Sequence, residues 1–448
     1  MKWQLSSLKT NVLHHIERFY IHISYIYVNK FYPILKIIFF FISILSIGIL
    51  IYEYGYGNLF KSTSIQFIVR IIIYYFIFYE GINLFFYREE DSFTIKEYFK
   101  KRKIEVIIAF IVLLLILFEN YFIKYLQYFK LSSDYIVLFY LSISQIFILL
   151  NNFLHFSRNI SNIKYKQINP SFVFLISFIF VIFIGIILLS SPNAHNKDIP
   201  LVDIVFTVVS ATCVTGLSTI DVGTDLNLAG QIILLSLIQI GGLGLMTLTS
   251  FFSYYLSGQV SLTNQIVMRE LFSEISLDKV KNTLRNVTIF TFLFEAIGTI
   301  YLYFSLPDDL IPSHKSKFFY ALFHSISAFC NAGFSLFSDS LYQVSKSSFI
   351  SIYGIMFLII FGGIGFPVIH DVIQKIKNKK YKISLTTRIV LMSNIIIWFF
   401  AFLVFLFFSE FYHFNLNWKE KVLHGLFYSI TPEQLDLIHY FIVIFPYL

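Results

Sequence analysis

Two short stretches of the sequence carry residue types that can bind a dehydrated metal ion through main-chain oxygens. The first reads Val209-Ser-Ala-Thr-Cys-Val-Thr-Gly216, and it recurs in altered form as Ile326-Ser-Ala-Phe-Cys-Asn-Ala-Gly333. Backbone carbonyls can replace the hydration shell of an ion only where the chain is non-helical and shielded from lipid. The glycine that ends each stretch permits backbone angles that a side chain forbids. The repeated pattern therefore predicts a pore.

Each stretch is followed by an apolar run that contains the pattern Gly-Gly-x-Gly. The glycines of the first run are Gly241, Gly242 and Gly244, and those of the second are Gly362, Gly363 and Gly365. The glycines that end the two stretches are 117 residues apart, and the first glycines of the two runs are 121 apart. These similar offsets indicate a duplicated unit of helix, re-entrant loop and helix. Because small residues let membrane helices approach closely, these glycines are candidates for gating or for packing.

The composition predicts an integral membrane protein. The chain has 448 residues, of which 57% are hydrophobic and only 13% charged, so a soluble domain could not bury its apolar surface. The net charge of +8 would suit nucleic acid. The basic residues, however, fall in short loops between apolar runs, so the sequence predicts the lipid bilayer as partner and no nucleic acid.

The apolar runs predict an all-α, polytopic fold with nine membrane-spanning helices. We expect these helices at 33–52, 66–87, 104–122, 134–154, 171–191, 229–256, 286–306, 348–373 and 388–409. Each is close to the roughly 20 residues that cross a bilayer. The segments 200–216, 316–333 and 418–431 are too short or too broken to cross, and we interpret them as half-helices that re-enter.

Positive charges orient the predicted helices. Lys and Arg gather in the loops 88–103, 158–166, 269–285 and 375–388, which all lie on one side if the short segments re-enter. The positive-inside rule makes that side the cytoplasm. Both repeated stretches then enter from outside the cell. The expected location is the cytoplasmic membrane, crossed several times.

Other residues that could carry chemistry give weaker signals. Glu295 lies inside the seventh predicted helix, where a carboxylate is either functional or held by a packed hydrogen-bond partner. His324 has no Cys or His neighbour at metal-ligand spacing. Cys213 and Cys330 occupy matching positions, which favours small packing residues over a disulfide. No set of residues resembles a catalytic motif, so we expect no enzyme activity.

The two repeats resemble the Trk/Ktr/HKT superfamily of potassium transporters. Ser-Ala-Thr-Cys-Val-Thr-Gly-Leu at 210–217, followed by Gln239-Ile-Gly-Gly-Leu-Gly244, is similar to the family's first repeat. Ser-Ala-Phe-Cys-Asn-Ala-Gly-Phe-Ser-Leu at 327–336, followed by Gly362-Gly-Ile-Gly365, is similar to its second. The resemblance covers about 170–432 and leaves the first 165 residues without an assigned role.

The resemblance implies a potassium-channel-like fold of four helix, pore loop, helix repeats around a central selectivity filter. It implies that the filter carbonyls belong to Cys213, Val214, Thr215, Gly216, Cys330, Asn331, Ala332 and Gly333. Glycine rather than serine at position 216 is the feature that goes with potassium permeation. The resemblance also implies potassium as the substrate with no bound cofactor, a homodimer, and a cytoplasmic ring of nucleotide-binding regulatory (RCK-type) subunits.

The third repeat departs from the family pattern, which commonly reads Arg-Thr-Ala-Gly-Phe-Asn-Thr. The chain has Pro432-Glu-Gln-Leu-Asp-Leu-Ile-His439 there. One coding sequence for these residues, CCA GAA CAG CTG GAT TTA ATA CAT, gives the family motif when it is read from the last base of the proline codon. We therefore hypothesise a single-nucleotide deletion near codon 432. Gene codons at 433–439 that do not encode the motif in another frame would contradict the hypothesis.

The predicted organisation has five segments. They are an N-terminal block of four membrane helices at 1–165, pore repeat 1 at 166–280, pore repeat 2 at 281–385, a partial repeat 3 at 386–432 and an out-of-frame tail at 433–448. Potassium uptake is the inherited function that the resemblance implies. The alternative is a non-transporting membrane fragment that only assembles with other proteins, because a filter needs carbonyls on all sides. The sequence does not distinguish channel-like from sodium- or proton-coupled transport.

Overall fold

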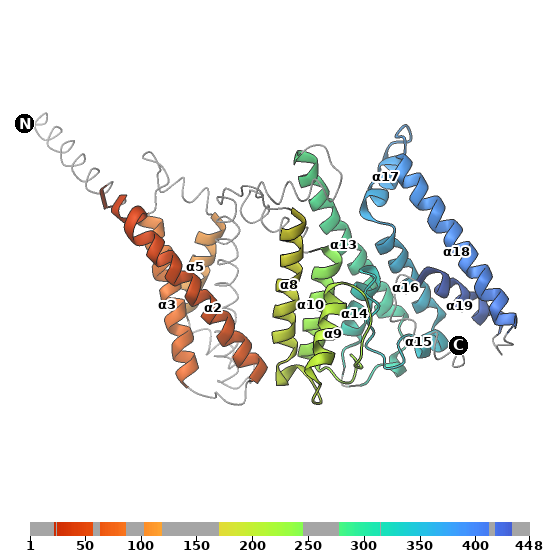
Figure 1. The fold of residues 1–448 in the computed structure, drawn as a ribbon, viewed down its shortest axis with the longest axis horizontal. Helices are drawn as coiled ribbons and strands as arrows, with labels where there is room; N and C mark the ends of the chain where they lie inside the picture. Colours follow the sequence, from red (N-terminus) through yellow and green to blue (C-terminus); the bar gives the residue numbers. More distant parts are fainter. Residues whose placement is uncertain are drawn as a thin grey trace, which may run out of the picture. The chain divides into compact units, whose positions relative to one another are not determined.

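The computed structural model describes residues 22–23, 25–56, 63–86, 103–118, 170–244, 277–313, 315–411 and 417–431 (Figure 1). These residues are almost entirely helical, and the only β-pairing among them is one isolated bridge between His195 and Leu226. The expected all-α fold is confirmed. The described helices belong to two compact units, α2 to α5 in the first and α8 to α19 in the second.

The described part of the first unit contains three long apolar helices and a short π-helix. They are η1 (Tyr27–Phe31), α2 (Tyr32–Tyr56), α3 (Thr63–Phe86) and α5 (Lys103–Leu117). Phe39 and Tyr79 stack in its core with ring centroids 4.2 Å apart, and the Tyr27 hydroxyl donates to Asn83 Oδ1 at 2.6 Å. Three of the four helices expected in this region are therefore present. The fourth, at 134–154, lies outside the described residues.

The second unit alternates long and short helices. Its helices are α8 (Pro170–Leu189), η2 (Pro192–Ala194), α9 (Leu201–Thr212), α10 (Leu228–Leu243), α13 (Leu277–Ser305), η3 (Asp308–Leu310), α14 (Lys317–Phe329), α15 (Tyr342–Ser347), α16 (Phe349–Gly363), α17 (Phe366–Lys377), α18 (Leu385–Phe411) and α19 (Trp418–Ile430). In Figure 1 the short helices α9, α14 and α19 lie toward one end of this unit, and α17 lies at the other end.

Each short helix packs against long helices that precede or follow it. α9 contacts α8 and α10, α14 contacts α13 and α16, and α19 contacts α18 and α16. α10 also contacts α14, so neighbouring groups share an interface. The three short helices fall within the segments 200–216, 316–333 and 418–431 that the sequence analysis expected to re-enter. The division into tandem repeats nevertheless stays a prediction.

Polar side chains fix where several helices begin. Asn227 caps α10 by accepting from the backbone of Ala229 at 2.9 Å and Gly230 at 3.1 Å. Asn417 and Glu420 form a reciprocal capping box at the start of α19. Such caps satisfy the amide groups that a helix leaves unpaired at its first turn. The starts of α10 and α19 are therefore fixed locally, by their own sequence.

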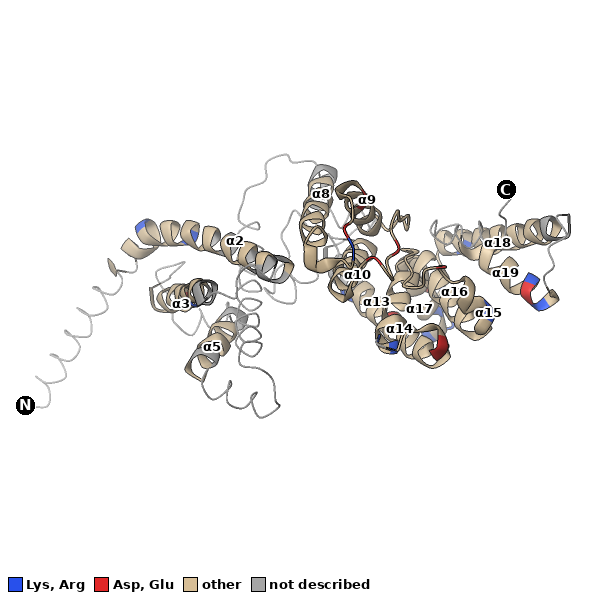
Figure 2. Cartoon of the chain, turned by 90° about the horizontal axis from the view of Figure 1, so that it is seen from below, with Lys and Arg blue, Asp and Glu red and all other residues tan. Residues whose placement is uncertain are grey.

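The surface of the second unit is suited to lipid. Two described helical segments, Arg285–Ser305 and Leu385–Phe407, are long and apolar enough to cross a membrane, and α16 with α17 would make a third if that bent pair is one span. Figure 2 shows that in this unit Lys, Arg, Asp and Glu lie mainly in loops and near helix ends, and that most of the helix flanks carry neither. Large side chains of α18 such as Ile395 and Phe400 are exposed. Exposed apolar flanks of this extent are typical of a membrane protein.

The expected helix at 348–373 differs from the structure. α16 ends at Gly363, and α17 starts at Phe366 after a bend of 98°. Gly365 adopts φ +87°, which is left-handed, and Pro367 lies in the first turn of α17. Proline lacks the amide hydrogen that would continue the helix ladder, so the chain turns here. The expectation of one helix came from hydropathy, and the apolar run continues across the break between α16 and α17.

Candidate ion-binding site

The two repeated stretches leave their short helices in the same way. Cys213 ends α9 and Cys330 ends α14, and each amide bonds the carbonyl four residues earlier, at 2.8 and 2.9 Å. The next two amides of each stretch also bond back to equivalent carbonyls. These bonds are Val214 to Ala211 at 3.2 Å, Thr215 to Ser210 at 2.8 Å, Asn331 to Ala328 at 3.1 Å and Ala332 to Ser327 at 2.8 Å. The matching bonds give both stretches one backbone conformation.

The backbone then leaves the helical region at matched positions. Val214 and Asn331 have φ values of 56° and 57°, and Gly216 and Gly333 have φ values of 90° and 75°. Among the described residues, no donor bonds the carbonyl oxygens of Cys213 through Gly216. The first stretch therefore presents a run of main-chain oxygens that have no hydrogen-bond donor within the described part of the chain.

The two stretches come together at their glycines. A Cβ atom on Gly216 would lie 2.5 Å from the Ala332 carbonyl oxygen and 3.4 Å from Gly333 Cα. The space beside Gly216 is thus filled by the main chain of the other stretch. All eight residues singled out from the sequence belong to two neighbouring segments, which we call the first filter segment (213–216) and the second filter segment (330–333).

The glycines of the Gly-Gly-x-Gly runs lie against the ends of the short helices. A Cβ atom on Gly241 would meet the carbonyl oxygen of Thr212, and one on Gly362 would meet that of Phe329. Gly242 lies against the Cys330 side chain. Gly244 and Gly365 take positive φ where α10 and α16 have ended, and Gly363 is the last residue of α16. Both runs therefore combine close packing with a helix break.

His324 supports the loop after the second filter segment. Its Nδ1 donates to the Tyr320 carbonyl at 2.8 Å, and its Nε2 accepts from the Leu336 amide at 3.3 Å. Ser327 Oγ donates to the Phe334 carbonyl at 2.7 Å. A cavity of about 10 Å³, close to the size of one water, lies between these residues. No cluster of three or more metal-ligating side chains occurs in the described residues.

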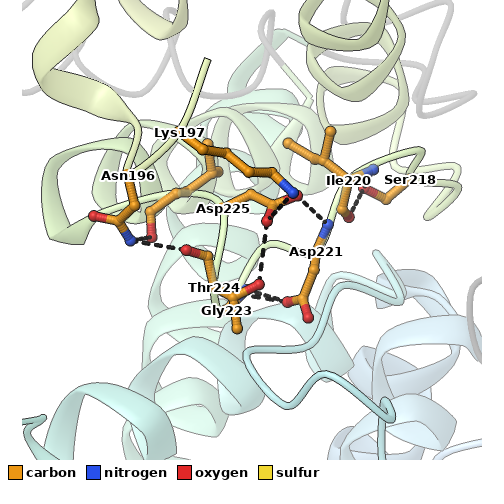
Figure 3. Close-up of polar contacts among 9 residues, drawn as sticks. Asn196, Lys197, Ser218, Ile220, Asp221, Gly223, Thr224 and Asp225 are labelled. Atoms are coloured by element: carbon orange, nitrogen blue, oxygen red, sulfur yellow. Dashed lines mark hydrogen bonds and ion pairs between the residues drawn. The ribbon is translucent and has the colours of Figure 1, made fainter. Parts of the chain in front are cut away.

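The loop outside the first filter segment is closed by a polar cluster that the sequence analysis missed (Figure 3). Asp225 pairs with Lys197 at 2.6 Å and accepts from the Asp221 amide at 3.0 Å. Asp221 Oδ1 in turn accepts from the amides of Gly223 at 2.9 Å and Thr224 at 3.2 Å. Both carboxylates thus have protein partners and shape the loop. The spacing of the two aspartates around a glycine was the available signal.

Lys315, which precedes α14, bonds the loop that contains Asp221 and Asp225. Lys315 Nζ donates to the Gly223 carbonyl at 2.6 Å. A Cβ atom on Gly223 would meet the carbonyl oxygen of Leu336, which follows the second filter segment. The loops around the two filter segments are therefore in direct contact. This contact and the approach of Gly216 to Ala332 place the segments side by side at one end of the unit.

Comparison with known proteins identifies the class. The sequence profile of TrkH, described as a cation transport protein, matches residues 140–423. The Ktr system potassium uptake protein B of Vibrio alginolyticus is 36% identical over 222 residues, 50% of this chain and 48% of that protein. Its Bacillus subtilis counterpart is 35% identical over 238 residues, 52% of each chain. The potassium/sodium uptake protein NtpJ of Enterococcus hirae is 30% identical over 275 residues, 60% and 59% of the two chains.

The fold and these matches define a multi-pass membrane protein of the cation-transporter class. The profile covers more than half of the 448 residues, and the chain belongs to the TrkH family. It spans about half the length of the curated relatives that it matches. The resemblance read from the repeated stretches is confirmed at the level of the family. The matched family is one of cation transport proteins, and the relatives named above are uptake proteins rather than enzymes.

Proposed function

We propose that this chain moves potassium ions across the cytoplasmic membrane through a filter of backbone carbonyls. The observation that carries the proposal is the neighbouring pair of filter segments, the first of which has carbonyls without hydrogen bonds from any described donor. An unpaired carbonyl inside a membrane costs several kcal/mol, roughly 2–7 by transfer measurements. A partly dehydrated ion supplies the missing partner. Relatives named for potassium uptake support this choice of ion.

The proposed ion ligands are carbonyl oxygens of both segments. They belong to Cys213, Val214, Thr215, Gly216, Cys330, Asn331, Ala332 and Gly333. The glycines of the two Gly-Gly-x-Gly runs hold the segments from behind, and their helix breaks are the candidate gating elements. The proposed assembly is a homodimer with a cytoplasmic nucleotide-binding ring, which the basic loop 375–388 faces.

A second candidate function is assembly without conduction. The described residues provide two filter segments, whereas an ion must be coordinated from all sides. In this proposal α19 is the half-helix of a partial third repeat, and the residues after Thr431 lie outside the described part of the chain. A chain that supplies only two segments would remain a membrane-embedded partner of other proteins.

Rescue of a cell that lacks potassium uptake separates the two functions. The chain as printed and a chain with the reading frame restored after codon 432 are expressed side by side at low potassium. Growth with the printed chain supports transport by this sequence. Growth with only the restored chain supports assembly without conduction for the printed sequence. Growth with neither, when both proteins reach the membrane, contradicts the transport proposal.

Gly216→Ser tests the filter directly in the chain that conducts. The added Cβ would lie 2.5 Å from the Ala332 carbonyl, so the segments must separate and potassium loses its fit. We expect the preference for potassium over sodium to fall by about tenfold, which corresponds to ~1.4 kcal/mol. Gly81→Ser is the matched control, because nothing lies within 4 Å of its added Cβ. Unchanged ion preference in Gly216→Ser would contradict the filter assignment.

A further inference from the structure

A buried carboxylate lies directly behind the second filter segment. Glu295, in α13, is only 3% exposed. Its Oε1 accepts from Gln239 Nε2 of α10 at 2.8 Å and is 3.8 Å from Cys330 Sγ. One carboxylate oxygen therefore contacts both the helix that follows the first filter segment and the first residue of the second filter segment.

The main chain at this position is also held. The Glu295 carbonyl accepts from Ser325 Oγ of α14 at 2.7 Å and from Thr299 Oγ1 at 2.7 Å. Gly298, on the same face of α13, lies against Ser325 Oγ. The backbone of α13 is thus fixed to the short helix that leads into the filter. The bonds fix the point from which the Glu295 side chain reaches toward Cys330.

The Cys330 thiol is also in contact with α10. A Cβ atom on Gly242 would meet Cys330 Sγ and Cβ, so α10 touches the thiol directly. Gln239 is three residues before Gly242, which places both residues on one face of α10. Cys330 is therefore held between Gly242 and Glu295, and Gln239 closes the arrangement by bonding the carboxylate.

We propose that Glu295 is a positioning residue that fixes the second filter segment to α10, so that a movement of α10 reaches the filter backbone at Cys330. The inference rests on the proposed function and deepens it. A buried carboxylate is costly, and an apolar side chain of similar volume would satisfy packing alone. Unlike an apolar side chain, the carboxylate bonds Gln239 and contacts the Cys330 thiol.

Thiol alkylation tests the proposal without any transport measurement. The chain has two cysteines, so Cys213→Ser leaves Cys330 as the sole target. In the purified full-length protein we expect Glu295→Ala to raise the rate of reaction of Cys330 with N-ethylmaleimide by about tenfold, because a contact on the thiol is lost. Gln239→Leu, which removes only the outer bond, should raise it by about threefold.

Two further variants separate positioning from general loosening. Glu295→Gln keeps a bonding group, and its amide can donate to Gln239 Oε1, a buried atom without a partner among the described residues. Its alkylation rate should stay well below that of Glu295→Ala, because the bond to Gln239 and the contact on the thiol are kept. Leu358→Ala opens a cavity beside Gly298 without touching the carboxylate. Equal acceleration in Leu358→Ala and Glu295→Ala, or none in Glu295→Ala and Gln239→Leu, would overturn the proposal.

Ion preference gives the second readout, in the chain that conducts. Glu295→Leu should lower the preference for potassium over sodium, and Glu295→Gln should retain it. Preference that is unchanged in Glu295→Leu would contradict a positioning role. If no form of the chain transports ions, the proposed function fails while the alkylation result still decides whether Glu295 holds Cys330. Should Glu295→Ala not fold, as judged by gel filtration, Gln239→Leu and Glu295→Gln decide the question.

Discussion

His324 supports the loop after the second filter segment through hydrogen bonds to the main chain. We expect His324→Phe to preserve the ring packing but to leave the Leu336 amide without its acceptor at 3.3 Å. The free energy of unfolding should fall by about 1–3 kcal/mol, the cost of a buried unsatisfied group. Thermal melting in detergent measures this loss, and faster amide exchange at 334–337 locates it. His370→Phe, at a half-buried ring on α17, should change stability by less than about 0.5 kcal/mol. Equal effects in the two variants would contradict the supporting role.

Tyr381 gives the loop between α17 and α18 a dependence on alkaline pH. Its hydroxyl donates to Asp371 Oδ1 at 2.9 Å, and this bond, with burial and the nearby negative charge, raises the pKa of Tyr381. Because the folded pKa lies above the unfolded value of about 10, the phenol stabilises the fold fully below pH ~10. The contribution is lost as the pH rises through the folded pKa.

Melting temperature measured from pH 8 to 11 tests this expectation. The parent chain should lose more stability above pH ~10 than Tyr381→Phe, which has no phenol to ionise. Comparing the two chains cancels the other tyrosines, which both contain. Parallel curves would show that the bond to Asp371 does not contribute in solution.

At the scale of the element, Gly362 and Gly365 separate two reasons for glycine within one run. A Cβ on Gly365 would have only Pro367 Cδ near it, at 3.9 Å, so its φ of +87° alone makes substitution unfavourable. Gly362 is helical, but its Cβ would meet the Phe329 carbonyl. We expect Gly365→Ala to cost about 1–3 kcal/mol from backbone strain and Gly362→Ala a similar 1–3 kcal/mol from overpacking.

Asparagine distinguishes the two glycines, because it tolerates left-handed backbone but is larger than alanine. Gly365→Asn should be milder than Gly365→Ala, whereas Gly362→Asn should be worse than Gly362→Ala. Melting temperatures of the four variants in detergent give the order. If asparagine were worse than alanine at Gly365 as well as at Gly362, space rather than backbone angle would limit substitution at the bend.

The elements themselves were largely predictable from the sequence. The expected starts at 229 and 418 lie close to the starts of α10 and α19, because Asn227 and Asn417 cap these helices locally. The positions of the filter segments followed from the repeat. The bond between Gln239 and Glu295 was not predictable, because the spacing of two residues along the chain says nothing about which helices become neighbours. The bend at Gly365 was missed because hydropathy does not register a single backbone angle.

At the scale of the whole molecule, the distribution of charge predicts which loops face each side of the membrane. In a chain with Cys213→Ser and Cys330→Ser, Asp309→Cys should react with an impermeant maleimide in intact cells. Lys379→Cys should react only after the membrane is permeabilised, because the basic loop is expected to be cytoplasmic. Both positions are exposed, so accessibility within the protein does not limit either reaction. Labelling of both from the same side would contradict the re-entrant topology.

The left-handed residues of the two filter segments have a consequence for how evenly the proposed pore would respond to ions. Val214 and Asn331 share nearly the same φ, 56° and 57°, but a β-branched side chain fits that region poorly, whereas asparagine tolerates it. The backbone at Val214 is therefore more strained than the backbone at Asn331. When the conducted ion is removed from the solution, we expect the backbone of the first filter segment to change conformation first, at Val214. The proposed pore without ions would then be asymmetric.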